Sequence, residues 1–430
     1  MQIIKRIKPG RIITAGFALL IIIGAILLSL PIAHNEGVDV SFIDALFTST
    51  SAVCVTGLIV VDTADTFNVF GRTIVAILIQ IGGLGITSFG VGIIILTGRH
   101  VGIKERTLVK EAMNLDSMKG MVKLVKSIFL MTISFETVGA LLSFISFSKN
   151  YSIADAAGIS IFHSIAAFNN SGFDILGGLT NLIPYREDIL LNLVTAFLII
   201  TGGLGFLVIK DIIVKRNFKK FTLHTKVVII TTIILLLSGT ILLKMTEKIS
   251  LLGAFFFSTS ARTAGFSTYN VGQFTNGGLF VLIILMFIGA SPGSTGGGIK
   301  TTTLFLIIEN IYSKSVNKYV TAFKRRIPSY IIGKAFNLSA LALMVVCLNT
   351  LLICILESNY EFIQILFEVV SALGTVGLST GITPELSDIS KFILVLVMFL
   401  GRLGLLTIAS IWYSKELPNS KYSEESIIIG

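Results

Sequence analysis

The sequence predicts an all-α integral membrane protein in which four repeats of helix, pore helix, filter loop and helix surround one central pore. Three observations lead to this fold class. The 430-residue chain is 53% hydrophobic and only 13% charged, whereas a soluble domain has about 25% charged residues. Apolar stretches of membrane-spanning length recur along the chain. Between them lies a short motif ending in glycine that occurs four times.

Eight apolar stretches have about the length of a membrane-spanning helix. Because their number is even, we expect both termini on the same side of the membrane. The first stretch follows several basic residues, as a signal peptide would. It is too long for a signal core and lacks a small-residue cleavage site, so we expect it to be retained. The stretches cover residues 12–31, 73–96, 122–147, 190–214, 227–243, 279–308, 331–356 and 392–413.

The net charge of +10 is unevenly distributed. Basic residues gather at the N-terminus and in residues 99–126, 210–226 and 314–334, whereas the intervening loops are acidic. The positive-inside rule then places both termini and the basic loops in the cytoplasm. Their position beside the spans is explained by topology and anionic lipid rather than by nucleic acid.

The three cysteines, Cys54, Cys347 and Cys354, have a spacing that fits neither a metal site nor a disulfide framework. We expect them to pack as small apolar residues within helices.

Within each pair of spans, an apolar run too short to cross the membrane precedes a loop of small residues. The runs, 41–52, 153–167, 250–260 and 360–372, are typical of re-entrant half-helices. The loops align without gaps at Gly57, Gly172, Gly265 and Gly377, and a large apolar residue follows each glycine. This predicts repeats at 12–97, 122–214, 225–312 and 331–413, followed by a cytoplasmic tail at 414–430.

The backbone of these four loops, called the glycine loops below, is suited to a bare cation. Non-helical backbone is tolerated at membrane depth where it lines a cavity, and carbonyl oxygens can replace the hydration shell of an ion. Glycine supplies the necessary dihedral angles. The half-helices would direct their negative C-terminal ends at the pore centre. The expected carbonyl ligands belong to Val55, Thr56, Gly57, Asn170, Ser171, Gly172, Thr263, Ala264, Gly265, Thr375, Val376 and Gly377.

The second helix of the third repeat is interrupted by residues 289–299, called the gate loop below. Glycine and proline are costly in helix interiors, so no helix continues here. A loop at this depth must line a cavity, and below the glycine loops it would obstruct the pore. We therefore expect a gate formed by Gly289, Ala290, Ser291, Pro292, Gly293, Ser294, Thr295, Gly296, Gly297, Gly298 and Lys300, together with Arg402.

Two alternatives bear on this segment. Its spacing does not match a phosphate-binding loop, and no strand precedes it. Lys300 takes part in the gate or snorkels to the cytoplasmic interface, and the sequence leaves both open. The glycine motifs at 81–85, 201–205 and 401–404 are explained by close helix packing.

Several polar residues lie within apolar helices or loops. A charge there is costly and usually functional, so we expect Arg402 to bond the gate loop, with a purely structural bond to helix ends as the alternative. Arg262 is expected to brace the third glycine loop by bonding Glu368. Glu136 is expected to bond Ser134 or a neighbouring chain. His163 is expected to be a hydrogen-bonded packing residue.

The chain resembles the ion-conducting subunit of the Ktr/Trk/HKT superfamily of potassium transporters, most of all the bacterial KtrB-type subunits. The matching stretches are 43–47, 80–85, 167–173, 223–226, 262–266, 374–378, 401–404 and the gate loop, within about residues 10–413. The resemblance implies a multi-pass protein of a bacterial cell membrane that takes up potassium. All four glycines are present, whereas some plant relatives that favour sodium carry a serine in place of the first.

The resemblance also implies partners. These are a second copy of the chain, giving a homodimer with one pore per protomer, and a cytosolic ring of RCK-type regulatory subunits on the basic loops. Nucleotides would bind that ring, so this chain needs no cofactor. Potassium is the transported ion, and a role for sodium as activator stays open.

Two other classes of function fit the residues less well. A secondary transporter of another small solute or cation would use broken helices at a midplane site, usually in two inverted halves. The sequence instead shows four parallel repeats. An intramembrane enzyme would need a reactive cluster. The four histidines do not pair with one, so we expect no enzyme.

Overall fold

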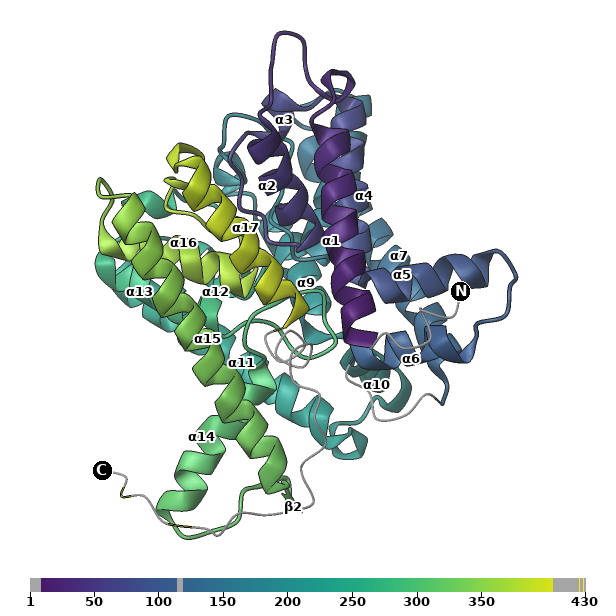
Figure 1. Ribbon diagram of the computed structural model, residues 1–430, viewed down its shortest axis with the longest axis vertical. Coiled ribbons are helices and arrows are strands. Elements are labelled where there is room, and N and C mark those ends of the chain that lie inside the picture. Colours follow the sequence, from purple (N-terminus) through teal and green to yellow (C-terminus); the bar gives the residue numbers. More distant parts are fainter. Residues whose placement is uncertain (1–8, 114–118, 405–424, 426–427, 429–430) are drawn as a thin grey trace.

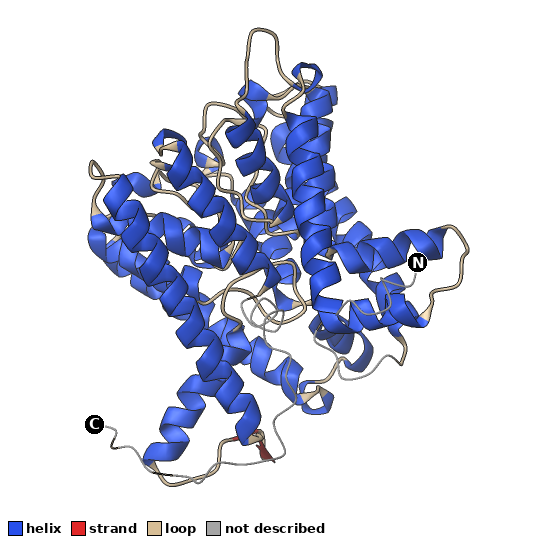
Figure 2. Cartoon of the chain, viewed as in Figure 1, coloured by secondary structure: helices blue, strands red, loops and turns tan. Residues whose placement is uncertain are grey.

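A computed structural model describes residues 9–113, 119–404, 425 and 428. Helices make up nearly all of its regular structure (Figure 2). In the described residues the single sheet is a hairpin of β1 (Thr321–Ala322) and β2 (Arg325–Arg326). The prediction of a helical membrane protein is confirmed, with this hairpin as an addition. Residues 405–413 of the last predicted span and the tail at 414–430 lie outside the described residues.

Within residues 9–113 and 119–404, four long helices are apolar enough to cross a membrane. Their mean hydropathy over an 18-residue window lies between 1.9 and 2.5. Each is the first helix of one predicted repeat, and each is followed by a half-helix that packs against it. They are α1 (Pro9–Leu28), α7 (Met121–Phe147), α11 (Leu223–Thr246) and α15 (Ser329–Leu356).

The four predicted half-helices are present, and each begins at a capping residue. In the first three, a serine hydroxyl accepts a hydrogen bond from the backbone N–H three residues later. The fourth begins with a capping box between Glu361 and Gln364. Each half-helix buries at least one phenylalanine in the core, and the second and third bury two, at positions 47, 162, 168, 256, 257 and 367. The half-helices are α2 (Phe42–Val53), α8 (Ile153–Phe168), α12 (Leu251–Ser260) and α16 (Phe362–Gly374).

The second helices are broken, which corrects the prediction of continuous spans at 73–96 and 190–214. The chain bends by 99° between α4 (Val69–Leu84) and α5 (Ile86–Leu96), and by 98° between α9 (Ile189–Leu204) and α10 (Phe206–Lys215). In the third repeat, the gate loop separates α13 (Asn276–Phe287) from α14 (Thr301–Ser315), as predicted. In the fourth, α17 (Asp388–Leu403) ends at the equivalent place.

A glycine in the left-handed region causes the breaks at Gly85 and Gly205 and ends α17 at Gly404; the φ angles are 79°, 93° and 83°. An L-residue with a side chain rarely adopts such angles, and a right-handed helix cannot continue through them. The glycine motifs also pack closely, as predicted. A Cβ atom on an earlier glycine of each motif would overlap a carbonyl group near the end of the half-helix, in the pairs Gly82–Val53, Gly202–Phe168 and Gly401–Leu373.

The contacts between helices form a closed cycle. The second helix of each repeat packs on the half-helix of the next, in the pairs α4–α8, α9–α12, α13–α16 and α17–α2. An ion pair of 2.8 Å between Lys391 on α17 and Asp44 on α2 joins the fourth repeat to the first. The four repeats therefore surround one axis. Below, the outer end of the bundle is the end at which the four half-helices begin.

Shorter elements complete the chain. Figure 1 shows α5 projecting sideways from the bundle, and α14 with one end of α15 extending away from it. The remaining helices are α3 (Thr63–Thr66), α6 (Ile103–Ala112), η2 (Pro31–Ala33), η3 (Ile183–Tyr185), η4 (Phe218–Lys220), η5 (Val271–Gln273) and η6 (Thr383–Glu385).

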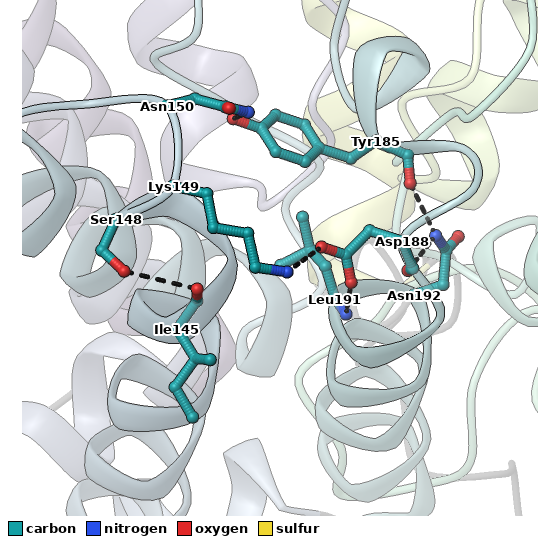
Figure 3. A network of polar contacts seen from close by, with 8 residues as sticks. All are labelled: Ile145, Ser148, Lys149, Asn150, Tyr185, Asp188, Leu191 and Asn192. Atoms are coloured by element: carbon teal, nitrogen blue, oxygen red, sulfur yellow. Dashed lines mark hydrogen bonds and ion pairs between the residues drawn. The ribbon is translucent and has the colours of Figure 1, made fainter.

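Polar contacts at the outer end fix the second repeat (Figure 3). The carboxylate of Asp188 caps α9 by accepting from the N–H of Leu191 at 3.0 Å, and Lys149 lies 3.6 Å from its other oxygen. The amide of Asn150 donates to the hydroxyl of Tyr185 at 3.2 Å. The connection before α8 is thereby joined to the start of α9.

Candidate ion filter and gate

The four glycine loops share one backbone conformation. Each glycine has a positive φ, and so does the residue two positions before it. A residue with a side chain is strained in this region and persists there only when its surroundings enforce it. Because the same strained backbone occurs in all four loops, the loops share one specific conformation that their surroundings maintain. The φ angles are 56° at Val55, 59° at Asn170, 73° at Thr263 and 50° at Thr375, and 89°, 68°, 76° and 94° at the glycines that follow.

The four glycines form a closed ring in chain order. A Cβ atom on each glycine would overlap the carbonyl oxygen that precedes the next glycine. Any side chain at these positions would therefore push a neighbouring loop outwards. The overlaps run from Gly57 to Ser171, from Gly172 to Ala264, from Gly265 to Val376 and from Gly377 back to Thr56.

Serines of the half-helices hold the first and fourth loops. The hydroxyl of Ser51 accepts from the N–H of Gly57 at 2.9 Å, and that of Ser371 accepts from the N–H of Gly377 at 3.1 Å. The second repeat has an alanine at this position. There the hydroxyl of Ser171 itself donates to the carbonyl of Ala166 at 3.2 Å.

The third loop is one residue shorter, so the gap-free alignment is wrong at the end of its half-helix. The N–H of Ala264 bonds the carbonyl of Ser260 at 2.9 Å, four residues back, whereas the bond spans five residues in the other loops. Earlier in the half-helix, the hydroxyl of Ser258 donates to a backbone carbonyl of α11. The hydroxyls of Ser49 and Ser164 donate in the same way to carbonyls of α1 and α7. These serines match only if the third half-helix is shifted by one residue.

The gate loop lies directly against the glycine loops. A Cβ atom on Gly296 would overlap the hydroxyl oxygen of Thr263, and one on Gly297 would overlap that of Thr375. Both threonines are strained residues of the third and fourth glycine loops. The gate loop therefore packs directly against the third and fourth glycine loops.

The gate loop is bonded to the second repeat and to itself. The N–H of Ser291 donates to the carbonyl of Gly203 at 3.0 Å, and the N–H of Phe206 donates to the carbonyl of Gly293 at 3.1 Å. The ammonium of Lys300 donates to the carbonyls of Gly296 and Gly297 at 2.8 and 3.2 Å. The contacts of Lys300 therefore favour a place in the predicted gate over snorkelling to the cytoplasmic interface.

Arg402 joins the gate loop to the first repeat. Its guanidinium donates to the carbonyl of Thr295 in the gate loop and to the carbonyls of Gly82 and Gly83 at the end of α4. It stands in the last turn of α17, where a cation is favoured by the helix dipole. The side chain thus connects three separate elements below the ring.

A family model described as "TrkH: Cation transport protein" matches residues 10–425. The chain belongs to this family. It is 41% identical over 440 residues to "Ktr system potassium uptake protein B" of Bacillus subtilis (strain 168), covering 99% of this chain and 97% of the relative. It is 36% identical over 446 residues to "Potassium/sodium uptake protein NtpJ" of Enterococcus hirae, covering 99% and 98%.

The fold is also that of a solved transporter. The crystal structure of the potassium transporter TrkH from Vibrio parahaemolyticus matches with a TM-score of 0.71 and 19% identity, covering 93% of this chain and 86% of that one. At this identity the likeness concerns the fold alone.

One contact that the sequence predicts for this TrkH-family chain is not formed. Arg262 does not bond Glu368. Its guanidinium lies 3.5 Å from the hydroxyl of Thr232 on α11, and its Nε has no partner in the described structure. The carboxylate of Glu368 instead accepts hydrogen bonds from its own repeat. The donors are Ser379 Oγ at 2.9 Å, Thr380 N at 2.8 Å, Thr380 Oγ1 at 2.9 Å and Thr383 Oγ1 at 2.7 Å.

Glu136 has a partner that the sequence did not indicate. Its carboxylate accepts from the amide of Asn169 at 3.0 Å, and the same amide donates to Gln80 at 3.0 Å. Asn169 directly precedes the second glycine loop, so this cluster supports the loop from behind. His163 bonds the hydroxyl of Thr195 at 2.9 Å and is buried, in agreement with a packing role.

Proposed function

We propose that this chain takes up potassium across the cell membrane of a bacterium. The ion would pass through a filter lined by the carbonyls of residues 55–57, 170–172, 263–265 and 375–377. The observation that carries the proposal is the closed ring of four glycines. A bare cation needs oxygen ligands from several sides, and a ring of carbonyls supplies them.

The surroundings of the ring favour a cation. All four half-helices run from the outer end of the bundle and stop at the ring, so their partial negative ends lie beside it. The residues flanking the glycines differ in side chain but share one backbone conformation, which is what ligation by carbonyls requires. The relative from Bacillus is named for potassium uptake, and the relative from Enterococcus is named for potassium and sodium uptake. A role for sodium as an activator of potassium uptake stays open.

We further propose that residues 289–298, Lys300 and Arg402 form the gate. The support for this is that the loop packs directly against the third and fourth glycine loops and is held by hydrogen bonds to Lys300 and Arg402. A flexible glycine-rich segment can change conformation at lower steric cost than a helix. Conduction would require the loop to leave the axis, which first breaks the bonds of Arg402 and Ser291.

The proposed assembly follows the charge pattern. Both termini and the basic loops would face the cytoplasm. A homodimer would carry a ring of RCK-type regulatory subunits on these loops, and nucleotide binding to that ring would control the gate. The repeats would span 12–97, 122–214, 225–312 and 331–413. The outer end of the bundle would face the external medium, where acidic residues attract cations.

Growth of a potassium-uptake-deficient bacterium tests the proposal. Cells that express the full chain with its regulatory subunit should grow on low potassium and accumulate the ion, whereas cells with the empty vector should not. The amount of chain in the membrane is measured in parallel. A chain that accumulates in the membrane without restoring potassium uptake would overturn the proposal.

A further inference from the structure

Asn181, in the segment that follows the second glycine loop, contacts the ring directly. Its Nδ2 donates to the carbonyl of Gly172 at 3.1 Å and to the carboxylate of Asp174 at 2.8 Å. Its Oδ1 accepts from the N–H of Ser267 at 3.0 Å and from the N–H of Leu182 at 2.9 Å. An amide has two donor and two acceptor positions. All four are occupied, so this side chain has one defined orientation.

The contact distinguishes one corner of the ring. Among the four ring glycines, all of which lie in the described part of the chain, only Gly172 has a carbonyl that accepts a side-chain hydrogen bond. A carbonyl oxygen has two lone pairs, so it can accept this bond and still face an ion. The bond reduces the negative potential of that oxygen and restrains its movement.

The segment that carries Asn181 is fixed on both sides. The N–H of Leu179 donates to the carboxylate of Asp62 at 2.7 Å, and the N–H of Gly178 donates to that of Asp65 at 2.9 Å. Both aspartates belong to the first repeat. On the other side, Leu182 and Asn181 bond Ser267 of the third repeat. The segment thus connects three repeats at the outer end, and Asn181 is held rigidly against the ring.

The backbone at this point requires particular residues. Asn181 has a φ of 50° and Leu179 has a φ of 54°, and the φ angles of Gly177 and Gly178 are also positive. Asparagine tolerates the left-handed region better than most residues. The strain is maintained by the bonds to Asp62, Asp65 and Ser267, and its effect is to place an amide donor at the ring.

We propose that Asn181 is a positioning residue that sets the discrimination between potassium and sodium by orienting the carbonyl of Gly172. This rests on the proposed function. Sodium is the smaller ion, so oxygens must move inwards to ligate it. Selectivity is attributed either to cavity size or to the field strength of the oxygens. An amide donor opposes inward movement and lowers the field strength, so both accounts favour potassium.

Two variants of Asn181 test the proposal in the full chain. Asn181→Asp keeps a small side chain and an acceptor for Ser267, but it replaces the donor to Gly172 by a carboxylate oxygen. Asn181→Gly keeps the backbone conformation and removes the amide. Influx of potassium and of sodium is measured in potassium-uptake-deficient cells. The potassium-to-sodium ratio should fall about two- to tenfold, the range expected for loss of one hydrogen bond.

The matched control is Asn150→Asp. Asn150 also lies at the outer end of the second repeat, but its amide donates to the hydroxyl of Tyr185 (Figure 3). The ratio should be unchanged in this variant. A general loss of folded protein would lower the influx of both ions equally, and the ratio separates that effect from a change at the ring.

The outcomes are distinct for the two proposals. Absence of potassium-selective influx in the unmodified chain refutes the proposed function. Selective influx in the unmodified chain, together with an unaltered ratio in either Asn181 variant that reaches the membrane, refutes the role of Asn181. A lowered ratio in both variants, with the control unchanged, supports it.

Discussion

Replacing Arg402 with alanine should raise the basal potassium flux, because this side chain joins the gate loop to the end of α4. The guanidinium bonds Thr295 on one side and Gly82 and Gly83 on the other. Removing it leaves all three carbonyls without this donor. It also removes a positive charge beside the proposed ion path, which lowers the electrostatic barrier to a cation.

The magnitude follows from the bond to the gate loop. A hydrogen bond with a charged partner contributes about 1.5–3 kcal/mol. One such bond, to Thr295, is lost between the loop and the rest of the molecule. If the bond is present only in the closed state, the open state gains about 10- to 150-fold in relative population. The bonds of Ser291 and Lys300 keep the loop formed, so the variant should fold.

The assay is potassium efflux from proteoliposomes that contain the purified full chain without its regulatory subunit. Arg72→Ala is the control, because Arg72 also donates to carbonyls near α4, those of Phe67 and Ala64 at 2.7 and 2.6 Å, away from the gate loop. The control should lower stability without raising flux. Equal basal flux in Arg402→Ala and the unmodified chain would refute a gate held closed by this residue.

Three further outcomes are expected. Gly57→Ser should reduce potassium over sodium selectivity in the influx assay, because its Cβ would overlap the adjacent loop, whereas Gly37→Ser has no neighbour within 4 Å and should not. Lys391→Met should lower the free energy of unfolding by about 1.5–3 kcal/mol, because a partly buried charged hydrogen bond to Asp44 is lost, and adding Asp44→Asn should restore part of it. Burial raises the pKa of Asp174 to about 6, while a backbone hydrogen bond opposes the shift. Its contribution to stability is therefore present below pH 4 and is lost as pH rises through 6, so Asp174→Asn should raise the melting temperature at pH 8 and not at pH 4.

The sequence predicts those parts of the fold that depend on local pattern. Half-helices are recognisable because an apolar run of their length is too short to cross a membrane. The gate loop is recognisable because proline and several glycines exclude a helix. The bends at Gly85 and Gly205 were not predicted, since glycine in a membrane helix serves close packing equally well. Only the φ angles, 79° and 93°, decide between these uses.

Contacts between distant segments are less accessible to the sequence. Charge complementarity suggested a pair between Arg262 and Glu368, but the loop after the fourth glycine brings hydroxyl groups to Glu368 first. The one-residue shift in the third repeat was missed because an ungapped alignment does not show where a helix ends. Its marker is the bond from Ser258 to α11, which depends on how two helices pack.

The ring is fourfold in its backbone but not in its supports. Serine hydroxyls hold the glycine N–H groups of the first and fourth loops. The second loop is held by Asn169 from behind and by Asn181 at its outer end. Because the first, second and fourth corners are supported by separate residues, a substitution at one of these supports can alter the position of a single carbonyl while the other three stay in place. Selectivity can therefore be changed without loss of the ring, which makes these supports better tests of the filter than the glycines themselves.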